Sequence, residues 1–599
     1  MAGSVLDLDQ VIVPDQLGTA LAVQYTTWDS LKTVRINDWN MIQKYVYATD
    51  TNNTANNALP WKNKTTVPKL CQIRDNLYAN YMAALFPKRQ SVTWEGSAGK
   101  DQTASKKTAI EAYCQNMMEQ PEFKEAVSRS ILDYIDYGNP FLSLTWKDEQ
   151  IAQDTGFKSG YVGPIPVRIS PLDIVFNPIA PSFSQTPKIV RSVVTIGELA
   201  NQLASFTSPE YAEETQKAFD YLKDVRKTVS QWNGGYKTKN ELFAIAGFTS
   251  FDVYLRSSYV EILTFQGDYY DVYNDKMYKN YVIHVADRHK ILGMRPNPSF
   301  LGKSSIFSTS WRMRPDNLWG MGPLDNLVGM QYRIDHVENL KADVFDLVAA
   351  PPLMIKGVVD DFQWGPFSKI YVGDDGDVKA LAPDVNALQY NLEIENLQNT
   401  MEVMAGSPKE AAGFRSPGEK TMYEVQRLEN AANRIFLTKV RQYEEQVLEP
   451  LLNAMLELAR RKMDGATVVR VFNDETHAMD FMSITPEDLS GMGRIRPIAA
   501  RVFAEKAERV QNMTNFYASA VGADPEIRAH MSTLALAEMF EDLLDIEPYN
   551  VVKPYIRIIE EQEAQKFVNA GQEQVALDAE TPAGTSPDDV SIPTQPQVA

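Results

Sequence analysis

The spacing of apolar residues changes along this 599-residue chain and divides it into a mixed first part and a more helical second part. Apolar residues recur at helical spacing in 21–47, 66–87, 105–120 and 122–138, which predicts four helices. Short β-type runs with Gly and Pro between them follow, such as FLSLTW and DIVFNP, and residues 258–296 predict a meander of strands. Helices and strands that are segregated in this way indicate an α+β domain.

A long helical pattern, residues 322–350, opens the second part and is bounded by Pro323 and by Pro351 and Pro352. Proline fits the first turn of a helix and stops a helix from continuing. The apolar stripe of this pattern is Leu324, Leu327, Ile334, Val337, Leu340, Val344 and Leu347, with Phe345 near its far end, and the acids off the stripe are Asp325, Asp335, Glu338, Asp343 and Asp346. Such a helix packs against copies of itself with its acidic face in water, or lies on its own domain, and the spacing gives both comparable weight.

Further along, the pattern predicts a compact β element, a second helix, a loop and a very long helix. The β element has a turn at Asp374, Asp375 and Gly376, and the long helix, residues 421–462, contains Pro450, where a kink is expected. A short strand, ATVVRVFND, follows, and then three helical runs near 501–519, 525–544 and 554–570. The Pro/Ser/Asp-rich end lacks aliphatic periodicity and is expected to be disordered.

The net charge of −19 argues against tight non-specific binding of nucleic acid, which depends on clustered Lys and Arg. Cys71 and Cys114 show no CxxC spacing, so neither a disulfide framework nor a cysteine metal site is predicted. No run of apolar residues is long enough to span a bilayer, and the start does not have the pattern of a signal peptide. We expect a soluble intracellular product or a part of a particle assembled in the cytoplasm.

The sequence contains few residues in arrangements that suggest catalysis. The five histidines are scattered, Gly302-Lys303-Ser304 ends like a phosphate loop but has Asn297 where its first glycine should stand, and no G-x-S-x-G motif is present. The acids around Gly376 lack the glutamate that ends a calcium loop, so an acidic turn is the better interpretation. We therefore predict no catalytic residue, no metal and no cofactor.

From about Tyr259 onward the chain resembles the portal (head-to-tail connector) proteins of tailed bacteriophages, especially short-tailed, podovirus-type ones. The segments that carry the resemblance are RMRPDNLWGMGPLDNLVGMQYRIDHVENLKADVFDLVAAPPLMIKG and SPGEKTMYEVQRLENAANRIFLTKVRQYEEQVLEPLL, and earlier YGNPFLSLTW and ISPLDIVFNP. Single motifs are degenerate, but their order and spacing extend over most of the chain. The resemblance is weakest in the first twenty residues and after Ile498.

The resemblance implies a portal fold with a mixed wing, a long-helix stem, a small β-containing clip and a helical crown. Its expected parts are an N-terminal arm at 1–20, a wing at 21–321 and 418–471, a stem helix at 322–350, a clip at 351–384, a returning stem helix at 385–404, a tunnel loop at 405–417, a crown at 472–577 and a disordered tail at 578–599. Leu327, Ile334, Val337 and Phe345 are then expected to pack between subunits.

The implied function is that of a non-catalytic ring, usually of twelve copies, at one capsid vertex of the virion. Double-stranded DNA would pass through it without sequence recognition during packaging and ejection. The implied partners are the terminase large subunit, head–tail adaptor and tail tube proteins, and the major capsid and scaffolding proteins, with no membrane.

The stretch GSPKEAAGFRSPGEKT would be the tunnel loop, with Lys409, Arg415 and Lys420 as its cations. Gly406 and Gly413 would give this loop freedom to move, and its cations would touch phosphates transiently beside an otherwise acidic wall. Pairing of the same cations with neighbouring acids such as Glu410 and Glu419 has equal weight.

Two other classes of protein compete with this interpretation. A hydrolase with long internal helices would require a polar catalytic constellation, which the sequence does not reveal. Another virion protein, either an ejection protein or an adaptor, fits less well, because the β-rich meander before Gly322 is unlike the first and the chain is too long for the second.

Overall fold

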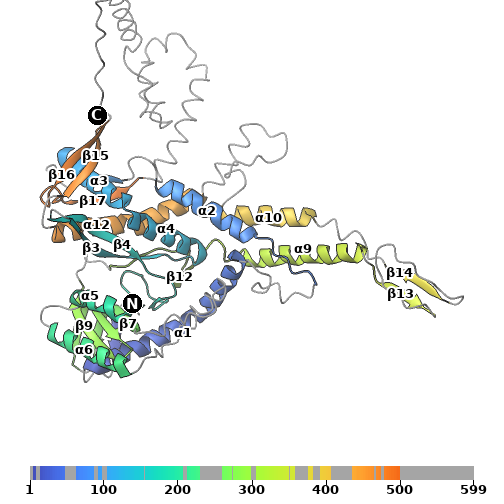
Figure 1. Cartoon of the computed structure of the whole chain (residues 1–599), viewed down its shortest axis with the longest axis horizontal. Helices are drawn as coiled ribbons and strands as arrows, with labels where there is room; N and C mark the ends of the chain where they lie inside the picture. The colour runs from blue at the N-terminus through green and yellow to red at the C-terminus, as the bar shows by residue number, and fades with distance from the viewer. Residues whose placement is uncertain are drawn as a thin grey trace, which may run out of the picture. The chain divides into compact units, whose positions relative to one another are not determined.

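The computed structural model describes residues 5–8, 14–47, 62–86, 92–96, 104–153, 156–206, 212–228, 259–272, 274–297, 305–349, 351–357, 376–381, 391–406, 435–463, 467–473 and 478–498. Residues 1–503 form one compact unit and residues 504–599 form a second. All described residues lie in the first unit, and they mix helices with mostly antiparallel sheets (Figure 1). The α+β class is thus confirmed, and a portal-specific fold stays a prediction.

The four helices predicted in the first part are present as α1 (Pro14–Val46), α2 (Lys69–Leu85), α3 (Ala104–Glu119) and α4 (Pro121–Asp136). Proline starts α4, where its missing N–H costs nothing. Gly138 follows α4 at φ +81°, and a Cβ atom there would lie 2.6 Å from the backbone of Met321 and Gly322. Only glycine therefore fits where the end of α4 passes the approach to α9.

Two elements of secondary structure begin within the stretch 1–20 that was predicted as an N-terminal arm. Helix α1 starts at Pro14, because Leu17 and Leu21 extend its buried face by a further turn. Strand β1 (Val5–Leu8) pairs in parallel with Asp268–Asp271 of β7 (Tyr259–Asp271). Both segments are held by residues more than 240 positions away, which local spacing does not reveal.

The predicted meander is a six-stranded sheet in the order β5-β6-β7-β8-β9, with β1 added to β7. Its other strands are β5 (Ile174–Phe176), β6 (Lys188–Thr195), β8 (Lys276–Ala286) and β9 (Lys290–Pro296). Side chains alternate between the two faces of a strand. Leu263 and Phe265 of β7 pack against α1, while Val260 and Ile262 pack with α5 (Ile196–Phe206) and α6 (Ala212–Thr228).

A second sheet joins β3 (Phe141–Gln153) and β4 (Gly156–Arg168) to the short β10 (Phe307–Ser308), in the order β10-β3-β4. A small ribbon of β11 (Arg312–Arg314) and β12 (Asn317–Met321) then leads toward α9. Helix α1 connects the cores: Leu21 and Trp28 belong to the cluster on the large sheet, Trp39 to an aromatic cluster with Phe141 and Trp319, and Tyr45 to the largest, helical cluster.

The long helical pattern of the second part is α9 (Val328–Ala349), which begins six residues later than predicted. The reason is local: the backbone N–H of Gly322 donates to Asp325 Oδ2, and that of Leu327 donates to the Leu324 carbonyl, so residues 322–327 form turns before the helix. The β element is the hairpin of β13 (Leu353–Lys356) and β14 (Asp377–Ala380), and the next helix is α10 (Asn391–Ala405).

The described part of the very long helix runs from residue 435 to Lys462 and includes α12 (Glu449–Lys462). A π-helical turn, η6 (Glu444–Leu448), lies directly before Pro450, the position where a kink is predicted. Proline lacks an N–H and its ring crowds the carbonyl four residues earlier, so the i→i−4 pattern cannot continue unchanged there.

The predicted start of a helical crown at residue 472 is wrong. Strand β15 (Thr467–Asn473) pairs with β16 (Ala478–Ile484), and β17 (Gly493–Pro497) pairs with β2 (Val92–Gly96). Residues 493–497 therefore complete a ribbon with the N-terminal part of the chain, and Ile495 is buried in the helical core. The helical runs after 500 and the tail lie outside the described residues.

Candidate functional site: helices α9 and α10 and the hairpin between them

The first half of α9 is anchored in the helical core of its own chain. Leu327, Ile334 and Val337 are at most 1% exposed and pack in the same cluster as α2, α4 and residues 436–459. The expectation that these three residues pack between subunits is therefore wrong. The apolar stripe is present, but neighbouring helices of the same chain cover its first half. This agrees with the alternative that the helix lies on its own domain.

Polar side chains on a second side of α9 bind the extended segment 62–67 through its backbone. Asn339 accepts from the Thr65 N–H at 2.7 Å and donates to the Thr65 carbonyl at 2.8 Å. Asp335 accepts from the Val67 N–H at 2.8 Å, and Gln331 donates to the Val67 carbonyl at 2.6 Å. A four-residue step along a helix is about 6 Å and a two-residue step along a strand about 6.6 Å, so the two spacings match.

The same ladder continues to Asp343 and Asp346. The carboxylate of Asp343 accepts from the backbone N–H groups of Lys62 and Asn63 at 2.8 Å each, and the Asn63 amide donates to Asp346 at 2.9 Å. Burial alone would raise the pKa of Asp343, but these N–H donors outweigh it and hold the pKa below its ordinary value. The sequence signal for this contact is the run of polar residues at i, i+4, i+8 and i+12, which are Gln331, Asp335, Asn339 and Asp343.

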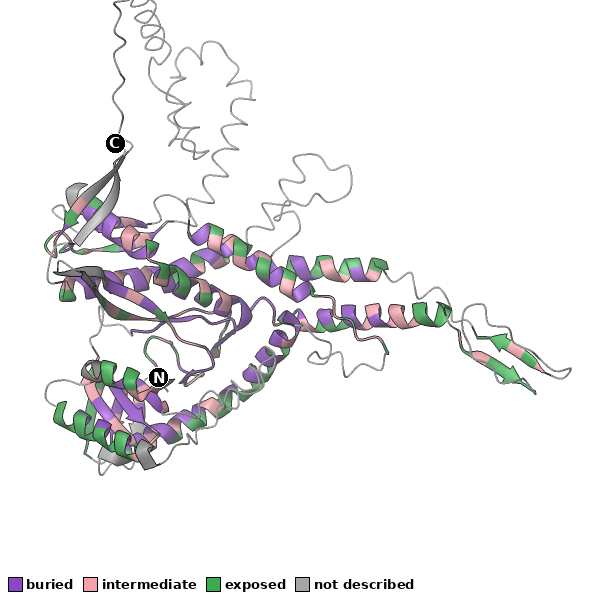
Figure 2. Cartoon of the chain, viewed as in Figure 1, coloured by how far each residue is buried: buried purple, intermediate pink, exposed green. Residues whose placement is uncertain are grey.

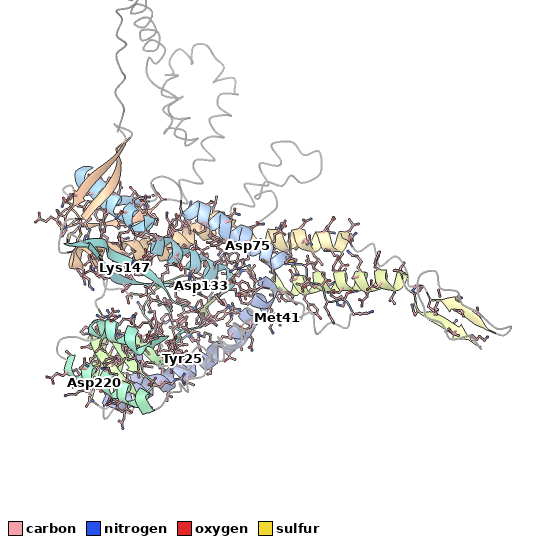
Figure 3. All side chains as sticks on the ribbon, in the orientation of Figure 1. Tyr25, Met41, Asp75, Asp133, Lys147 and Asp220 are labelled. Atoms are coloured by element: carbon pink, nitrogen blue, oxygen red, sulfur yellow. The ribbon has the colours of Figure 1, made fainter. Side chains whose placement is uncertain are left out.

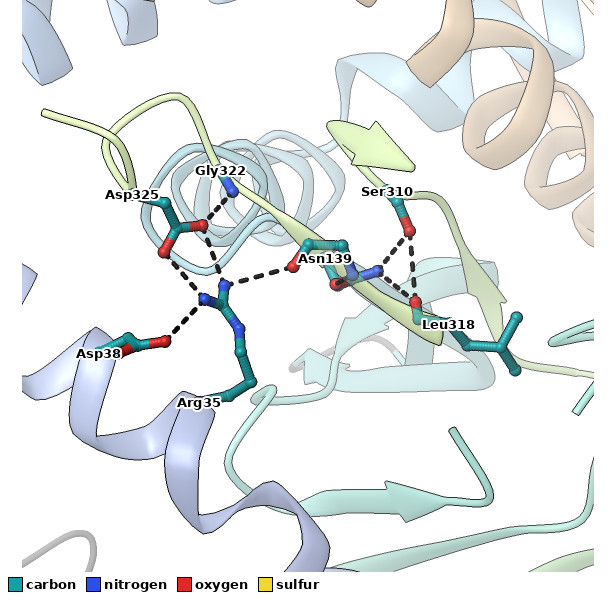
Figure 4. Close-up of polar contacts among 8 residues, drawn as sticks. Arg35, Asp38, Asn139, Ser310, Leu318, Gly322 and Asp325 are labelled. Carbon is teal, nitrogen blue, oxygen red and sulfur yellow. Dashed lines mark hydrogen bonds and ion pairs between the residues drawn. The ribbon is translucent and has the colours of Figure 1, made fainter. Parts of the chain in front are cut away.

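The expected acidic face in water is therefore wrong for two of its five members, Asp325 and Asp335, while Asp343 is partly exposed and Asp346 is exposed. Asp335 is fully buried, and Asp325 is buried in a two-pronged ion pair with Arg35 of α1, at 2.9 and 3.0 Å (Figure 4). Glu338 is half-buried and pairs with Lys341 at 2.8 Å. These acids serve contacts inside the chain, since the helix is covered on two sides in its first half.

The far half of α9 is different, because it becomes exposed (Figure 2). Phe345 is 61% exposed, and Leu347 and Val348 are exposed as well. Helix α10 returns antiparallel beside α9: Arg333 pairs with Glu393 at 2.9 Å, and Lys341 donates to Asn391 at 3.1 Å. The end of α10 reaches the core, where the buried Glu402 pairs with Lys69.

The hairpin between the two helices is a two-stranded sheet of its own. Its register pairs Leu353 with Ala380 and Lys356 with Asp377, and in the described residues no third strand joins it. Met354 and Ile355 of β13 and Leu381 just after β14 are all exposed. A lone two-stranded hairpin is marginally stable in water, so this one is expected to gain stability from a further surface.

Most of the predicted tunnel loop, with Lys409, Gly413, Arg415 and Lys420, lies outside the described residues. Gly406 is described: it ends α10 at φ +74°, a left-handed conformation that suits glycine after a helix, so its role here is to stop α10. On the other side of the loop, the helix from residue 435 is anchored by Lys439, which donates to the Trp311 carbonyl, and by Tyr443, which shares a hydrogen bond with Ser130 at 2.9 Å.

Within the described part of the chain, no three His, Cys, Asp or Glu side chains gather as metal ligands would, and no helix is long and apolar enough to cross a bilayer. The buried ionisable groups are engaged with other parts of the fold. Asp133 is buried against Arg168 at 2.6 Å and Asp136 against Arg74 at 2.8 Å, and both pairs connect α4 to a neighbouring element. Among the described residues, a set of exposed apolar side chains lies on the outer part of α9, on the hairpin and at the start of α10, and it is suited to binding a partner: Phe345, Leu347, Val348, Met354, Ile355, Leu381 and Leu392.

No protein-family model matches this chain, and no curated protein matches it.

Proposed function

We propose that the chain is the ring-forming subunit of a tailed-phage portal, through which double-stranded DNA is packaged and ejected. In this proposal α9 and α10 are the stem, the β13–β14 hairpin belongs to the clip, and the protein has no catalytic activity of its own. A terminase large subunit and later head–tail adaptor and tail proteins would dock on the clip. Capsid and scaffolding proteins would surround the ring, and the site of action would be the portal vertex of the virion.

One observation carries the proposal: a helix pair rooted in the core bears a two-stranded hairpin, and apolar side chains are exposed along its outer part. The exposed apolar residues of this region are Phe345, Leu347, Val348, Met354, Ile355, Leu381 and Leu392. Contiguous exposed apolar residues mark interaction surfaces. Neighbouring copies of the same hairpin would supply the surface that the hairpin lacks, and obligate assemblies of this kind bury more than about 2,000 Å² per contact.

The net negative charge of the chain supports a channel through which DNA passes rather than a site that binds DNA tightly. Twelve copies would carry 12 × −19 = −228 formal charges, so the ring as a whole would repel the duplex and offer it no deep binding site. The acids of α9 contribute less to such a wall than their spacing suggested, because Asp325 and Asp335 are buried. Contact between DNA and Lys409, Arg415 or Lys420 stays part of the proposal.

Negative-stain electron microscopy of the purified protein, with mass photometry beside it, tests the proposal. The expected result is rings with a central channel and a mass near 810 kDa for twelve copies of a 67.4 kDa chain. A uniform monomer or dimer at micromolar protein, with and without scaffolding protein, would contradict it. A duplex-DNA titration at physiological salt serves as the second measurement, and tight binding by the ring would also contradict a sliding channel.

A further inference from the structure

Helix α1 is held rigidly along its inner side. A Cβ atom on Gly18 would lie 2.5 Å from the His289 carbonyl oxygen, so the helix backbone touches the turn between β8 and β9 directly. The ammonium group of Lys32 is buried and donates to the carbonyls of Pro171, Leu172 and Ile174 at 3.3, 2.8 and 3.0 Å. The orientation of the outer face is therefore set by the fold.

Over the six turns from residue 16 to 37, no exposed position of α1 is charged, and the first exposed charge after them is Asp38, which pairs with Arg35 at 3.1 Å. Its exposed positions from residue 16 to 37 are Gln16, Thr19, Val23, Thr26, Thr27, Ser30, Leu31, Thr33, Val34 and Asn37. Val34 is 71%, Val23 62% and Leu31 60% exposed, and Met41 extends the stripe. At 100° per residue, Val23, Val34 and Met41 point within about 20° of one another. Asp29, at the border of this face, is half-exposed and pairs with Lys32.

Helix α6 provides the internal comparison. Its exposed positions from 212 to 224 are Ala212, Glu213, Glu214, Gln216, Lys217, Asp220, Tyr221, Lys223 and Asp224, and six of these nine are charged. Figure 3 marks Asp220 on α6 and Met41 on α1. In a chain of net charge −19, a helix that faces water is expected to carry charged residues on its exposed side. Helix α6 does so and α1 does not.

Three of the hydroxyl groups on the α1 face, those of Thr26, Thr27 and Ser30, are already bonded within the helix. Thr26 Oγ1 donates to the Ala22 carbonyl and Thr27 Oγ1 to the Val23 carbonyl, both at 3.0 Å, and Ser30 donates to the Thr27 carbonyl at 2.7 Å. These donors do not need water, and the threonines contribute their methyl groups to the surface. Covering this face would therefore cost little desolvation of polar groups.

We propose that the outer face of α1, from Gln16 to Asn37, is a contact between copies of this chain. The inference rests on the proposed function, since a ring supplies the second copy, and it adds a contact in addition to the stem. Two subunits of charge −19 repel each other wherever their acids meet, so a face whose exposed positions carry no acid over six turns is where a second copy can approach most closely. Nucleic acid would require cations, and a membrane-surface helix would require basic and large aromatic residues, neither of which the face has.

The size of the face makes it part of a larger interface. The stretch from residue 16 to 37 is about 33 Å long at 1.5 Å per residue and about 10 Å wide, so the face covers about 330 Å² per copy. A stable interface buries about 800 Å² per partner. Contacts of α9, α10 and the hairpin would supply the remainder.

The experiment compares Val34→Glu with Ala212→Glu, which adds the same charge to an exposed apolar position on α6. Both residues are exposed, so far-UV circular dichroism and the melting temperature of the dissociated subunit should stay unchanged. Val34→Glu is expected to raise the dissociation constant between copies tenfold or more in mass photometry, because it buries a charge against an acidic partner. Ala212→Glu should leave it unchanged, and Val34→Thr should stay close to wild type.

The outcomes separate the inference from the proposed function. Rings of wild type that persist unchanged with Val34→Glu would overturn the α1 contact and leave the portal proposal standing. A wild-type dimer that Val34→Glu dissociates would support the α1 contact and contradict the portal. Wild-type monomer that floats with phosphatidylcholine vesicles, with flotation lost in Val34→Glu, would overturn the contact in favour of a membrane. If the Val34→Glu variant does not fold, Val34→Gln is measured in its place. It is expected to raise the dissociation constant between copies as well, by a smaller factor.

Discussion

At the scale of single residues, buried charges hold together segments that are far apart in the sequence. Arg35 and Asp325 are separated by 290 positions, yet the guanidinium of Arg35 binds both carboxylate oxygens of Asp325 and the Gly320 carbonyl. Asn139 completes the same site by accepting from the Gly320 N–H at 2.7 Å and donating to the Thr309 carbonyl. This network fixes the approach to α9 against α1 and α4.

We therefore expect Arg35→Ala to lower the free energy of unfolding by about 3–5 kcal/mol, because it leaves Asp325 buried without its cation. The matched control is Arg333→Ala, which breaks the exposed pair with Glu393 and should cost about 0–1 kcal/mol. Urea unfolding followed by circular dichroism measures both. Equal effects of the two substitutions would argue against a structural role for the buried pair.

A second residue-scale prediction concerns His284, which is buried on β8 and shares a hydrogen bond with Thr264 at 3.1 Å. Burial, with a smaller effect of Arg295, lowers its pKa from the ordinary 6.5 to about 3. Below pH 6.5 the unfolded chain takes up a proton that the folded chain does not, so stability falls as the pH decreases toward 3.

His284→Gln should remove this part of the acid sensitivity. Between pH 6.5 and 4.5 the difference in unfolding free energy between wild type and variant should shift by about 2–3 kcal/mol in favour of the variant. Parallel urea titrations at several pH values measure it. A constant difference over this range would show that His284 does not cause the loss.

At the scale of elements, α9 is one helix with two environments. Its apolar stripe was predicted correctly as a pattern, but the first half packs inside the chain and the far half is exposed. The sequence of the stripe does not reveal which half is buried, because burial depends on which other helices lie beside each turn. The segment 62–67 adds to this, since its backbone occupies the side of α9 where water was expected.

This division predicts opposite phenotypes for two substitutions on one helix. Phe345→Asp should weaken ring assembly and leave the far-UV circular dichroism of the subunit largely intact, because Phe345 is exposed. Ile334→Ala should instead lower the free energy of unfolding of the subunit by about 2–5 kcal/mol, because it creates a cavity in the core. Native mass spectrometry and thermal unfolding distinguish the two, and undiminished rings with Phe345→Asp would contradict the stem contact.

At the scale of the whole molecule, the unit of residues 1–503 is held together by pairing between β17, near its C-terminal end, and β2, at residues 92–96. Strand β17 pairs with β2 across about 400 positions, and Ile495 packs in the core beside Trp94. The Asn453 side chain clamps the same strand, with hydrogen bonds to the N–H and carbonyl of Ile495 at 2.8 and 2.9 Å. The sequence-based boundary at residue 472 would cut through this unit.

A chain ending at residue 503 should therefore melt cooperatively with intact near-UV circular dichroism. A chain ending at residue 490 lacks β17 and should melt at a lower temperature or fail to stay soluble, since β2 loses its partner and part of the core opens. Differential scanning calorimetry of both chains checks this. Equal melting temperatures would mean that β17 contributes nothing to the unit.

Local spacing was sufficient for the type and approximate limits of α2, α4, the meander strands and the β13–β14 hairpin, because periods of 3.6 and 2 and the Pro and Gly breaks are properties of adjacent residues. Only the tertiary structure decided which side of each element is covered. It buried Leu327 and left Phe345 exposed, placed Asp335 against Val67, and joined β17 to β2. Which side of α1 is exposed also emerged only from burial. Val34 and Trp39 are both apolar in the sequence, and contacts with distant segments determine which of them is exposed to water.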